Sequence, residues 1–307
     1  MTMIEARGLT KEYRGIRAVD DLTFTVSPGR VTGFLGPNGA GKSTTMRLIL
    51  GLNRPTAGTA TVDGQPYTAA PQPLRLVGAL LDPGAAHPSR TARHHLLALA
   101  IGNGIPARRV DSVLDEVGLT SVAGKRIRTF SLGMRQRLGI AAALLGDPPV
   151  LMLDEPSNGL DPEGIVWLRE TLRRMARDGR TVLVSSHLMT ETASYADHLL
   201  VLGRGRVLAD TDLDDFVGRH GGTRVRVRSS DPVLMRDTLS RNGTEPIPGD
   251  GDSWLVPGER AARLGPLLIG AGVPILELAD EQASLEQAYL ALTAHAADFT
   301  TRSKDFA

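Results

Sequence analysis

Residues 36–43 of the chain read Gly36-Pro37-Asn38-Gly39-Ala40-Gly41-Lys42-Ser43. This stretch matches the P-loop pattern, and it lies between a short apolar strand expected at Val31 to Leu35 and a helix expected from about Lys42 to Gly51. The glycines allow backbone N–H groups to turn inward around a phosphate chain, and the amino terminus of the helix adds its partial positive charge. A glycine-rich turn that binds nothing is the weaker alternative, because the strand–loop–helix context is complete.

We expect this loop and the first residues of the helix to bind a nucleotide. Lys42 can reach the terminal phosphates, and the hydroxyl of Ser43 can be a ligand of Mg²⁺. Thr44 completes the predicted nucleotide-binding segment.

A second element lies far downstream, where the apolar run Val150 to Leu153 is followed by Asp154 and Glu155. A strand that ends in two carboxylates is a weak signal alone, because many strands end where they meet solvent. Downstream of a P-loop, the same pair of carboxylates is a strong signal. Asp154 would hold the hydration shell of Mg²⁺, and Glu155 would polarise an attacking water.

Short apolar strands alternate with helices over the first two-thirds of the chain. Further strands are expected at Leu22 to Val26, Thr59 to Val62 and Thr181 to Ser185, and a helix at about Gly164 to Asp178. Residues 83–149 have helical periodicity and are expected to form a helical subdomain. This alternation favours an α/β domain over residues 1–216, with a mainly parallel sheet covered on both faces.

The composition changes after about Phe216, and Gly221-Gly222 marks an expected hinge. Residues 221–293 are predicted to form a small α+β accessory domain of the split βαβ type, and residues 294–307 a flexible tail. In the accessory domain Arg224, Arg226 and Arg228 share one face of a strand. A solvated edge strand protected by charge explains them better than binding of nucleic acid or lipid head groups.

Length and composition exclude several classes of protein. The 307 residues, 41% of them hydrophobic, indicate about two folded domains. The net charge of +1 gives no general electrostatic reason to bind nucleic acid or an anionic membrane. The absence of cysteine excludes disulfides and thiolate chemistry. No apolar run approaches the roughly 18 residues of a membrane span, and no signal peptide is recognised, so the cytoplasm is the expected compartment.

Taken together, the motifs resemble those of the ATPase subunit of an ABC transporter over roughly residues 3–210. The segment Phe130-Ser131-Leu132-Gly133-Met134-Arg135-Gln136 resembles the family signature Leu-Ser-Gly-Gly-Gln. Leu132 replaces the first glycine and Met134 the glutamine, as is familiar in the drug- and lantibiotic-exporting branch. The resemblance implies that this signature, chiefly Ser131 and Gly133, acts in trans on the nucleotide held by the opposite subunit.

The resemblance also implies roles for residues whose local sequence says little. The segment Asn158-Gly159-Leu160-Asp161 resembles the D-loop, which contacts the partner subunit. His187 resembles the switch histidine at the γ-phosphate, and Tyr13 the aromatic that stacks on adenine. Asp82 stands where the family has its Q-loop glutamine. A contact with Mg²⁺ and coupling to a membrane subunit therefore compete with a simple role in the turn Asp82-Pro83-Gly84.

The resemblance as a whole implies an ATP- and Mg²⁺-dependent ATPase at the cytoplasmic face of the membrane, which powers a separate transmembrane permease subunit. Two copies would enclose two ATP molecules, although a heterodimer with a degenerate sister chain remains open. The segment Ser284 to Leu290 resembles the end of drug-exporter subunits and favours drug, antibiotic or lantibiotic efflux. The alternatives are a soluble ABC-type ATPase acting on nucleic acid or ribosomes, and a P-loop small-molecule kinase. Proteins of the first class resemble tandem cassettes or carry long coiled coils, and this chain shows neither feature. The signature and the D-loop argue against the second class.

Overall fold

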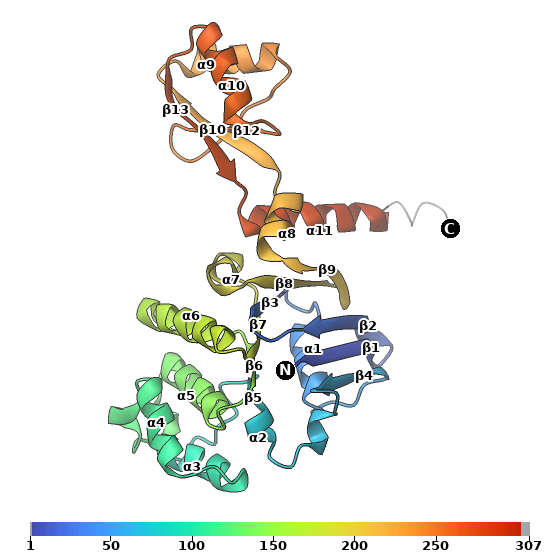
Figure 1. Ribbon diagram of the computed structural model, residues 1–307, viewed down its shortest axis with the longest axis vertical. Helices are drawn as coiled ribbons and strands as arrows, with labels where there is room; N and C mark the ends of the chain where they lie inside the picture. Colours follow the sequence, from blue (N-terminus) through green and yellow to red (C-terminus); the bar gives the residue numbers. More distant parts are fainter. Residues whose placement is uncertain (1, 302–307) are drawn as a thin grey trace. The chain divides into compact units, whose positions relative to one another are not determined.

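The computed structural model describes residues 2–301, and the chain divides into two units, Met1–Asp212 and Leu213–Ala307 (Figure 1). The division falls shortly before residue 216, where the composition changes. Helix α8 (Leu213–His220) belongs to the second unit because it packs against α11 (Leu285–Thr301). Within the described residues, no helix has both the length and the apolar character needed to span a bilayer.

The larger sheet of the first unit has six strands in the order β5-β6-β7-β3-β8-β9. They are β3 (Val31–Leu35), β5 (Val77–Leu80), β6 (Val150–Asp154), β7 (Thr181–Ser186), β8 (His198–Gly203) and β9 (Arg206–Asp212). All neighbours are parallel except β8 and β9. Strands β3, β6 and β7 are buried along their whole length, as parallel strands covered on both faces should be.

A smaller antiparallel sheet contains β1 (Ile4–Tyr13), β2 (Ile16–Val26) and β4 (Ala57–Val62), in the order β2-β1-β4. The strands expected at Leu22 to Val26 and Thr59 to Val62 therefore lie in a second sheet, apart from the mainly parallel one. Buried and exposed residues alternate from Leu22 to Val26. That pattern belongs to a sheet with one face on a core and the other toward solvent.

The helices of the first unit cover both faces of the six-stranded sheet (Figure 1). Helix α1 (Lys42–Ile49) contacts β1, β2 and β4 of the smaller sheet and β6 of the larger one. On the other face, α6 (Pro162–Arg177) and α7 (Met189–Tyr195) contact β3 and β7. The predicted helical region holds α3 (Ala92–Gly102), α4 (Arg108–Glu116) and α5 (Leu132–Leu144), and α5 also packs on β5 and β6. The short helix α2 (Pro73–Leu76) precedes β5.

The second unit has the element order strand–helix–strand–strand–helix–strand, which is the split βαβ arrangement. Its elements are β10 (Thr223–Ser229), α9 (Pro232–Arg241), β11 (Ile247–Pro248), β12 (Trp254–Pro257), α10 (Ala261–Gly270) and β13 (Ile275–Gln282). Val225 and Val227 of β10 pack with Met235 and Leu268 of the two helices in a separate core.

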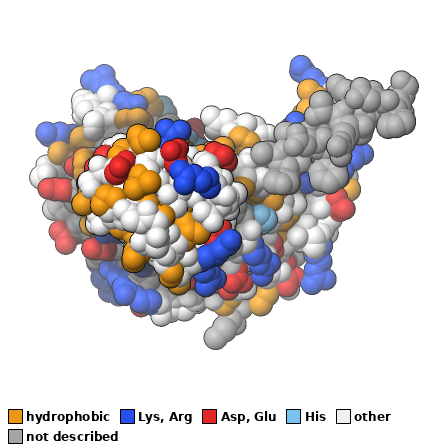
Figure 2. Space-filling model, turned by 90° about the horizontal axis from the view of Figure 1, so that it is seen from above, with side chains coloured by type: hydrophobic (Ala, Val, Ile, Leu, Met, Phe, Trp, Pro, Cys, Tyr) orange, Lys and Arg blue, Asp and Glu red, His pale blue; other side chains and the backbone are white. Residues whose placement is uncertain are grey.

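Strand β10 lies inside the four-stranded sheet, whose order is β11-β12-β10-β13. The expectation that Arg224, Arg226 and Arg228 mark an edge strand was wrong. Arg224 and Arg226 both bond to Glu281 of β13, and Arg228 forms an ion pair with Asp252 at 2.8 Å. The positive row is thus balanced by carboxylates on its neighbours. Basic and acidic side chains are also interspersed on the face seen in Figure 2.

Helix α11 continues to Thr301, so it extends into residues 294–307, which were expected to form a flexible tail. A capping box starts the helix: the Gln287 N–H donates to the Ser284 hydroxyl, and the Gln287 side chain accepts from the Ser284 N–H. The added turns contain Ala294, Ala296 and Ala297, and alanine has the highest helix propensity. Residues 302–307 lie outside the described part of the chain.

Candidate functional site

The candidate site lies where three neighbouring parallel strands end. Strand β7 lies between β3 and β6, and the pairs Leu35–Ser186 and Asp154–Ser185 stand opposite each other in the sheet. The P-loop follows β3, the carboxylate pair ends β6, and His187 follows β7. This edge is the usual ligand-binding edge of a parallel sheet. The structure therefore brings together three motifs that are far apart in the sequence.

The P-loop turns into α1 through glycine backbone. Gly41 caps the helix with a φ of 105°, and a Cβ there would lie 2.5 Å from the carbonyl oxygen of Ala18. Gly36 and Ala40 are buried, whereas Pro37, Asn38 and Gly39 form the exposed rim of the loop. Ser43 is exposed and Thr44 half-buried at the first turn of the helix. The loop is shaped by its backbone, and its rim is exposed to solvent.

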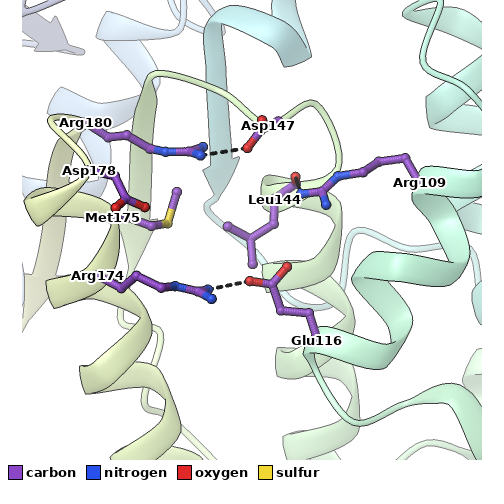
Figure 3. Close-up of a pocket in the computed structure, with 8 residues that line it drawn as sticks. All are labelled: Arg109, Glu116, Leu144, Asp147, Arg174, Met175, Asp178 and Arg180. Atoms are coloured by element: carbon purple, nitrogen blue, oxygen red, sulfur yellow. Dashed lines mark hydrogen bonds and ion pairs between the residues drawn. The ribbon is translucent and has the colours of Figure 1, made fainter.

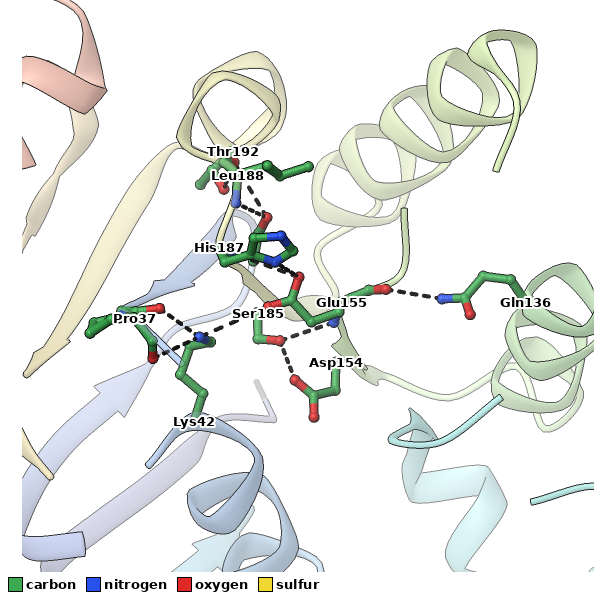
Figure 4. A network of polar contacts seen from close by, with 11 residues as sticks. Pro37, Lys42, Gln136, Asp154, Glu155, Ser185, His187, Leu188 and Thr192 are labelled. Carbon is green, nitrogen blue, oxygen red and sulfur yellow. Dashed lines mark hydrogen bonds and ion pairs between the residues drawn. The ribbon is translucent and has the colours of Figure 1, made fainter. Parts of the chain in front are cut away.

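Lys42 is buried and bends back over its own loop. Its Nζ donates to the carbonyl oxygen of Gly36 at 2.6 Å and lies 3.9 Å from Oε1 of Glu155 (Figure 4). Burial lowers the pKa of Lys42, and the nearby carboxylates of Glu155 and Asp154 oppose that shift. Phosphate oxygens at the loop could replace the carbonyl acceptor and add negative charge beside the ammonium.

Glu155 is held in a sparsely populated backbone conformation, with a φ of 49°. Its N–H donates to the carbonyl oxygen of Ser185 and to that residue's hydroxyl at 3.0 Å. Its carboxylate Oε2 lies 2.7 Å from Nδ1 of His187 (Figure 4). Non-glycine residues in this conformation cost energy and persist where the surroundings fix them, as happens at functional sites. Glu155, His187 and Lys42 thus form one group around the end of β6.

Asp154 is 8% exposed, and one of its carboxylate oxygens accepts a hydrogen bond from the Ser185 hydroxyl. Together with the Ser43 hydroxyl it offers hard oxygen ligands, which suit Mg²⁺. Among the described residues, no group of three or more His, Cys, Asp or Glu side chains could hold a metal ion. Mg²⁺ is typically bound by one or two protein oxygens together with phosphates and water, so the residues present fit this ion.

The signature and D-loop segments touch one another. Ser131 caps α5 and accepts a hydrogen bond from the Met134 N–H at 3.2 Å. A Cβ on Gly133 would lie 2.5 Å from the carbonyl oxygen of Gly159, and one on Gly159 would lie 2.6 Å from the side chain of Leu132. Both glycines are needed for this close approach. Leu132 is 56% exposed, so the same contact region also faces outward.

At the end of the D-loop, Asp161 caps α6 by accepting from the Gly164 N–H at 3.1 Å and also accepts from Arg137 at 3.0 Å. The pKa of Asp161 is lowered, chiefly by the hydrogen bond from Arg137. Asn158 is exposed and Leu160 half-buried between these points. The D-loop is thus fixed at its carboxyl-terminal end.

Two predicted residues lie apart from this group. Tyr13 is 43% exposed, its hydroxyl accepts a hydrogen bond from Asn53, and Nζ of Lys11 lies 4.9 Å from its ring centroid. Asp82 Oδ1 accepts from the Gly84 N–H at 2.7 Å, which is the turn bond that a simple turn residue would make. No contact joins Asp82 to the P-loop in this structure among the described hydrogen bonds, so its wider role stays a prediction.

The sequence analysis missed three residues that shape the site. Ser185 bonds to both Asp154 and Glu155, although it was expected only as the last residue of the strand Thr181 to Ser185. Gln136 and Arg137 of α5 bond to Glu155 and Asp161. The polar run Arg135 to Arg137 in a helix whose other residues are apolar or glycine was the available signal.

A pocket of about 270 Å³ elsewhere in the first unit contains none of the predicted residues (Figure 3). It lies between α4, the turn after α5, α6 and the start of β7. Its charges are largely paired, with Arg174 2.5 Å from Glu116 and Arg180 2.7 Å from Asp147. It therefore offers no concentrated charge for a ligand.

Comparison with known proteins decides the family. A family model described as "ABC transporter" matches residues 19–158. The bacitracin transport ATP-binding protein BcrA of Bacillus licheniformis is 40% identical over 222 residues, which cover 71% of this chain and 72% of that protein. The chain belongs to the ABC transporter ATP-binding proteins. The daunorubicin/doxorubicin resistance ATP-binding protein DrrA of Streptomyces peucetius is 32% identical over 308 aligned residues, which cover 96% of this chain and 93% of that protein.

A solved structure described as the ATP-binding subunit of an ABC transporter superposes on this ABC protein with a TM-score of 0.66. The identity is 31%, and the match covers 71% of this chain and 93% of the other. A second family model, a domain of unknown function, matches residues 223–286 of the second unit. These likenesses confirm the resemblance to the ABC family, the P-loop cassette fold, ATP binding and the ATPase activity, whereas the roles of single residues stay predictions.

Proposed function

We propose that this ABC ATPase powers export of a drug, antibiotic or lantibiotic through a separate membrane subunit. The observation that carries the proposal is the likeness to DrrA, which extends over 96% of this chain and so includes the second unit. DrrA is a daunorubicin/doxorubicin resistance protein by name, and BcrA a bacitracin transport protein. The resemblance of Ser284 to Leu290 to drug-exporter subunits supports the same branch. The chain would then act as a peripheral subunit at the cytoplasmic face of the membrane.

At the catalytic site, Glu155 would polarise the water that attacks the γ-phosphate in line. His187, 2.7 Å from Oε2 of Glu155, would orient that carboxylate and contact the γ-phosphate. Lys42 would exchange its carbonyl acceptors for phosphate oxygens. When bound with ATP at Ser43 and Asp154, Mg²⁺ supplies neutralising charge at the β- and γ-phosphates. Catalysis would rest on positioning and charge stabilisation.

Two copies would complete two sites, each using the P-loop of one copy and the signature of the other. The exposed Leu132, the capping Ser131 and the contact between Gly133 and Gly159 support this arrangement. In the proposed dimer, the signature and the D-loop of one copy would face the partner copy together. Because Glu155, His187 and the signature are all present in the chain, a homodimer would be catalytically complete.

The test is to express the full chain with the membrane protein encoded beside it and to measure ATPase activity in lipid. The proposal expects the two proteins to co-purify and the membrane subunit to raise the ATPase rate. DNA, RNA and ribosomes, added in parallel, should leave the rate unchanged. Stimulation by nucleic acid or ribosomes without co-purification would instead favour the soluble alternative and contradict export.

A further inference from the structure

Two adjacent residues of α5 bind the two ends of the segment between Glu155 and Asp161. Nε2 of Gln136 donates to the carbonyl oxygen of Glu155 at 3.1 Å (Figure 4), and Nη2 of Arg137 donates to Asp161 at 3.0 Å. Arg137 also donates to the carbonyl oxygen of Val117, which anchors it within the helical region. The helix that begins at the signature therefore holds the residues that follow β6.

The bond from Gln136 acts on the residue with the most constrained backbone in the site. Glu155 has a φ of 49°, and its N–H is already bound by Ser185. Its carbonyl oxygen accepts from the Asn158 N–H at 3.3 Å, inside the same loop, and from Gln136. Gln136 is thus the donor from another element that fixes the carbonyl side of Glu155. Because backbone rotation at Glu155 would swing its carboxylate, this bond bears on where the carboxylate points.

The burial of Gln136 suggests a specific use for its amide. The side chain is 1% exposed, yet its Oε1 has no hydrogen-bond partner. A buried, unpaired carbonyl costs stability, so an apolar side chain of the same size would pack there at lower cost. The reverse orientation of the amide would place two oxygens against each other, so the donor must face Glu155. What the glutamine provides is a single hydrogen bond to the carbonyl of Glu155.

We propose that Gln136 is a positioning residue that orients the carboxylate of Glu155 for hydrolysis. The proposal rests on the proposed role of Glu155 as the group that polarises water. Because Gln136 and Ser131 lie on the same helix, a shift of α5 when the signature engages nucleotide is passed to Glu155 of the same copy. Gln136 would act through the backbone of Glu155 and is not itself a catalytic residue.

The first test compares Gln136→Leu with wild type in the full-length chain, by steady-state ATPase kinetics and thermal unfolding. Loss of one positioning hydrogen bond should lower kcat about fivefold, with KM for ATP unchanged within about twofold. Tm should stay level or rise, since the unpaired Oε1 is removed. Ile140→Val, a buried change one turn along α5, is the matched control and should lower Tm without lowering kcat. An unchanged kcat in Gln136→Leu overturns the proposal.

The second test uses Gln136→Glu, which is nearly the same size and keeps the proposal falsifiable if the leucine variant fails to fold. A carboxylate cannot donate a hydrogen bond, whereas the protonated acid can. The ratio of its kcat to that of wild type should therefore rise as the pH falls. A ratio that does not change with pH means that Gln136 only fills space, and it refutes positioning.

A third variant separates this proposal from the role of Glu155. If Glu155→Gln hydrolyses ATP at nearly the wild-type rate, the proposed function of Glu155 fails. If Glu155→Gln is inactive while Gln136→Leu is not impaired, only the positioning proposal fails. The double variant should be no slower than Glu155→Gln alone, because both changes act through one carboxylate.

Discussion

Replacing Tyr13 by alanine should weaken ATP binding through loss of the ring alone. The ring is 43% exposed and already carries a cation, Nζ of Lys11, 4.9 Å from its centroid. Aromatic stacking contributes about 0.5–1.5 kcal/mol, and a partly exposed ring should contribute about 1 kcal/mol. A loss of about 1 kcal/mol corresponds to a roughly fivefold rise in Kd. Tyr13→Phe removes only the exposed bond from Asn53, which water can replace, so its Kd should stay within about twofold.

Calorimetric titration measures this most directly, with ATP and inorganic triphosphate as paired ligands. The triphosphate lacks adenine, so Tyr13→Ala should not change its affinity, whereas the affinity for ATP falls. Asn53→Ala is the matched control for the hydroxyl contact and should behave like Tyr13→Phe. An equal loss in Tyr13→Phe and Tyr13→Ala, or a parallel loss of triphosphate binding, would refute adenine stacking.

Two further predictions concern Asp82 and His198. Asp82→Ala should leave ATP affinity nearly unchanged but remove most of the stimulation of ATPase activity by the membrane subunit. In Asp82→Asn the side chain can still accept the hydrogen bond from the Gly84 N–H. Full stimulation in that variant would mean that Asp82 serves only as a turn residue. Burial alone would lower the pKa of His198, but its hydrogen bonds to Asp210 and Asp212 outweigh burial and raise it. A histidine whose pKa is raised by folding stabilises the folded state. This stabilisation is fully present below the unfolded pKa of about 6.5 and is lost as the pH rises through the folded pKa. The excess unfolding free energy of wild type over His198→Gln, measured by denaturant titration, should therefore fall above about pH 6.5, and an excess that grows with pH would contradict the pairing.

The strands that carry the site were predictable because each is short, apolar and followed by a polar motif. Val31 to Leu35 and Thr181 to Ser186 lie in the interior of a parallel sheet, where both faces demand apolar side chains. Which strands pair with one another was harder to predict from the sequence. The alternation in β2 indicates a half-exposed strand, but nothing local says that its partner is β1 in a second sheet.

Long-range contacts explain the remaining errors. The arginines of β10 suggested an edge because their partner, Glu281, lies on a strand far along the chain. The importance of Gln136 follows only from the packing of α5 against the loop after β6. Local patterns report burial and chemistry, whereas pairing between distant residues requires the fold.

The ATPase turnover of Glu155→Gln tests most directly whether Glu155 is the catalytic carboxylate. The substitution keeps the shape of the side chain and removes the charge that polarises water. Purified full-length chain should lose ATPase activity by at least about a hundredfold, the scale of a lost general base. ATP binding should persist, and ATP-dependent dimers should accumulate, as measured by size-exclusion chromatography with light-scattering detection. Near-normal turnover in this variant would contradict the assignment of Glu155 as the catalytic carboxylate.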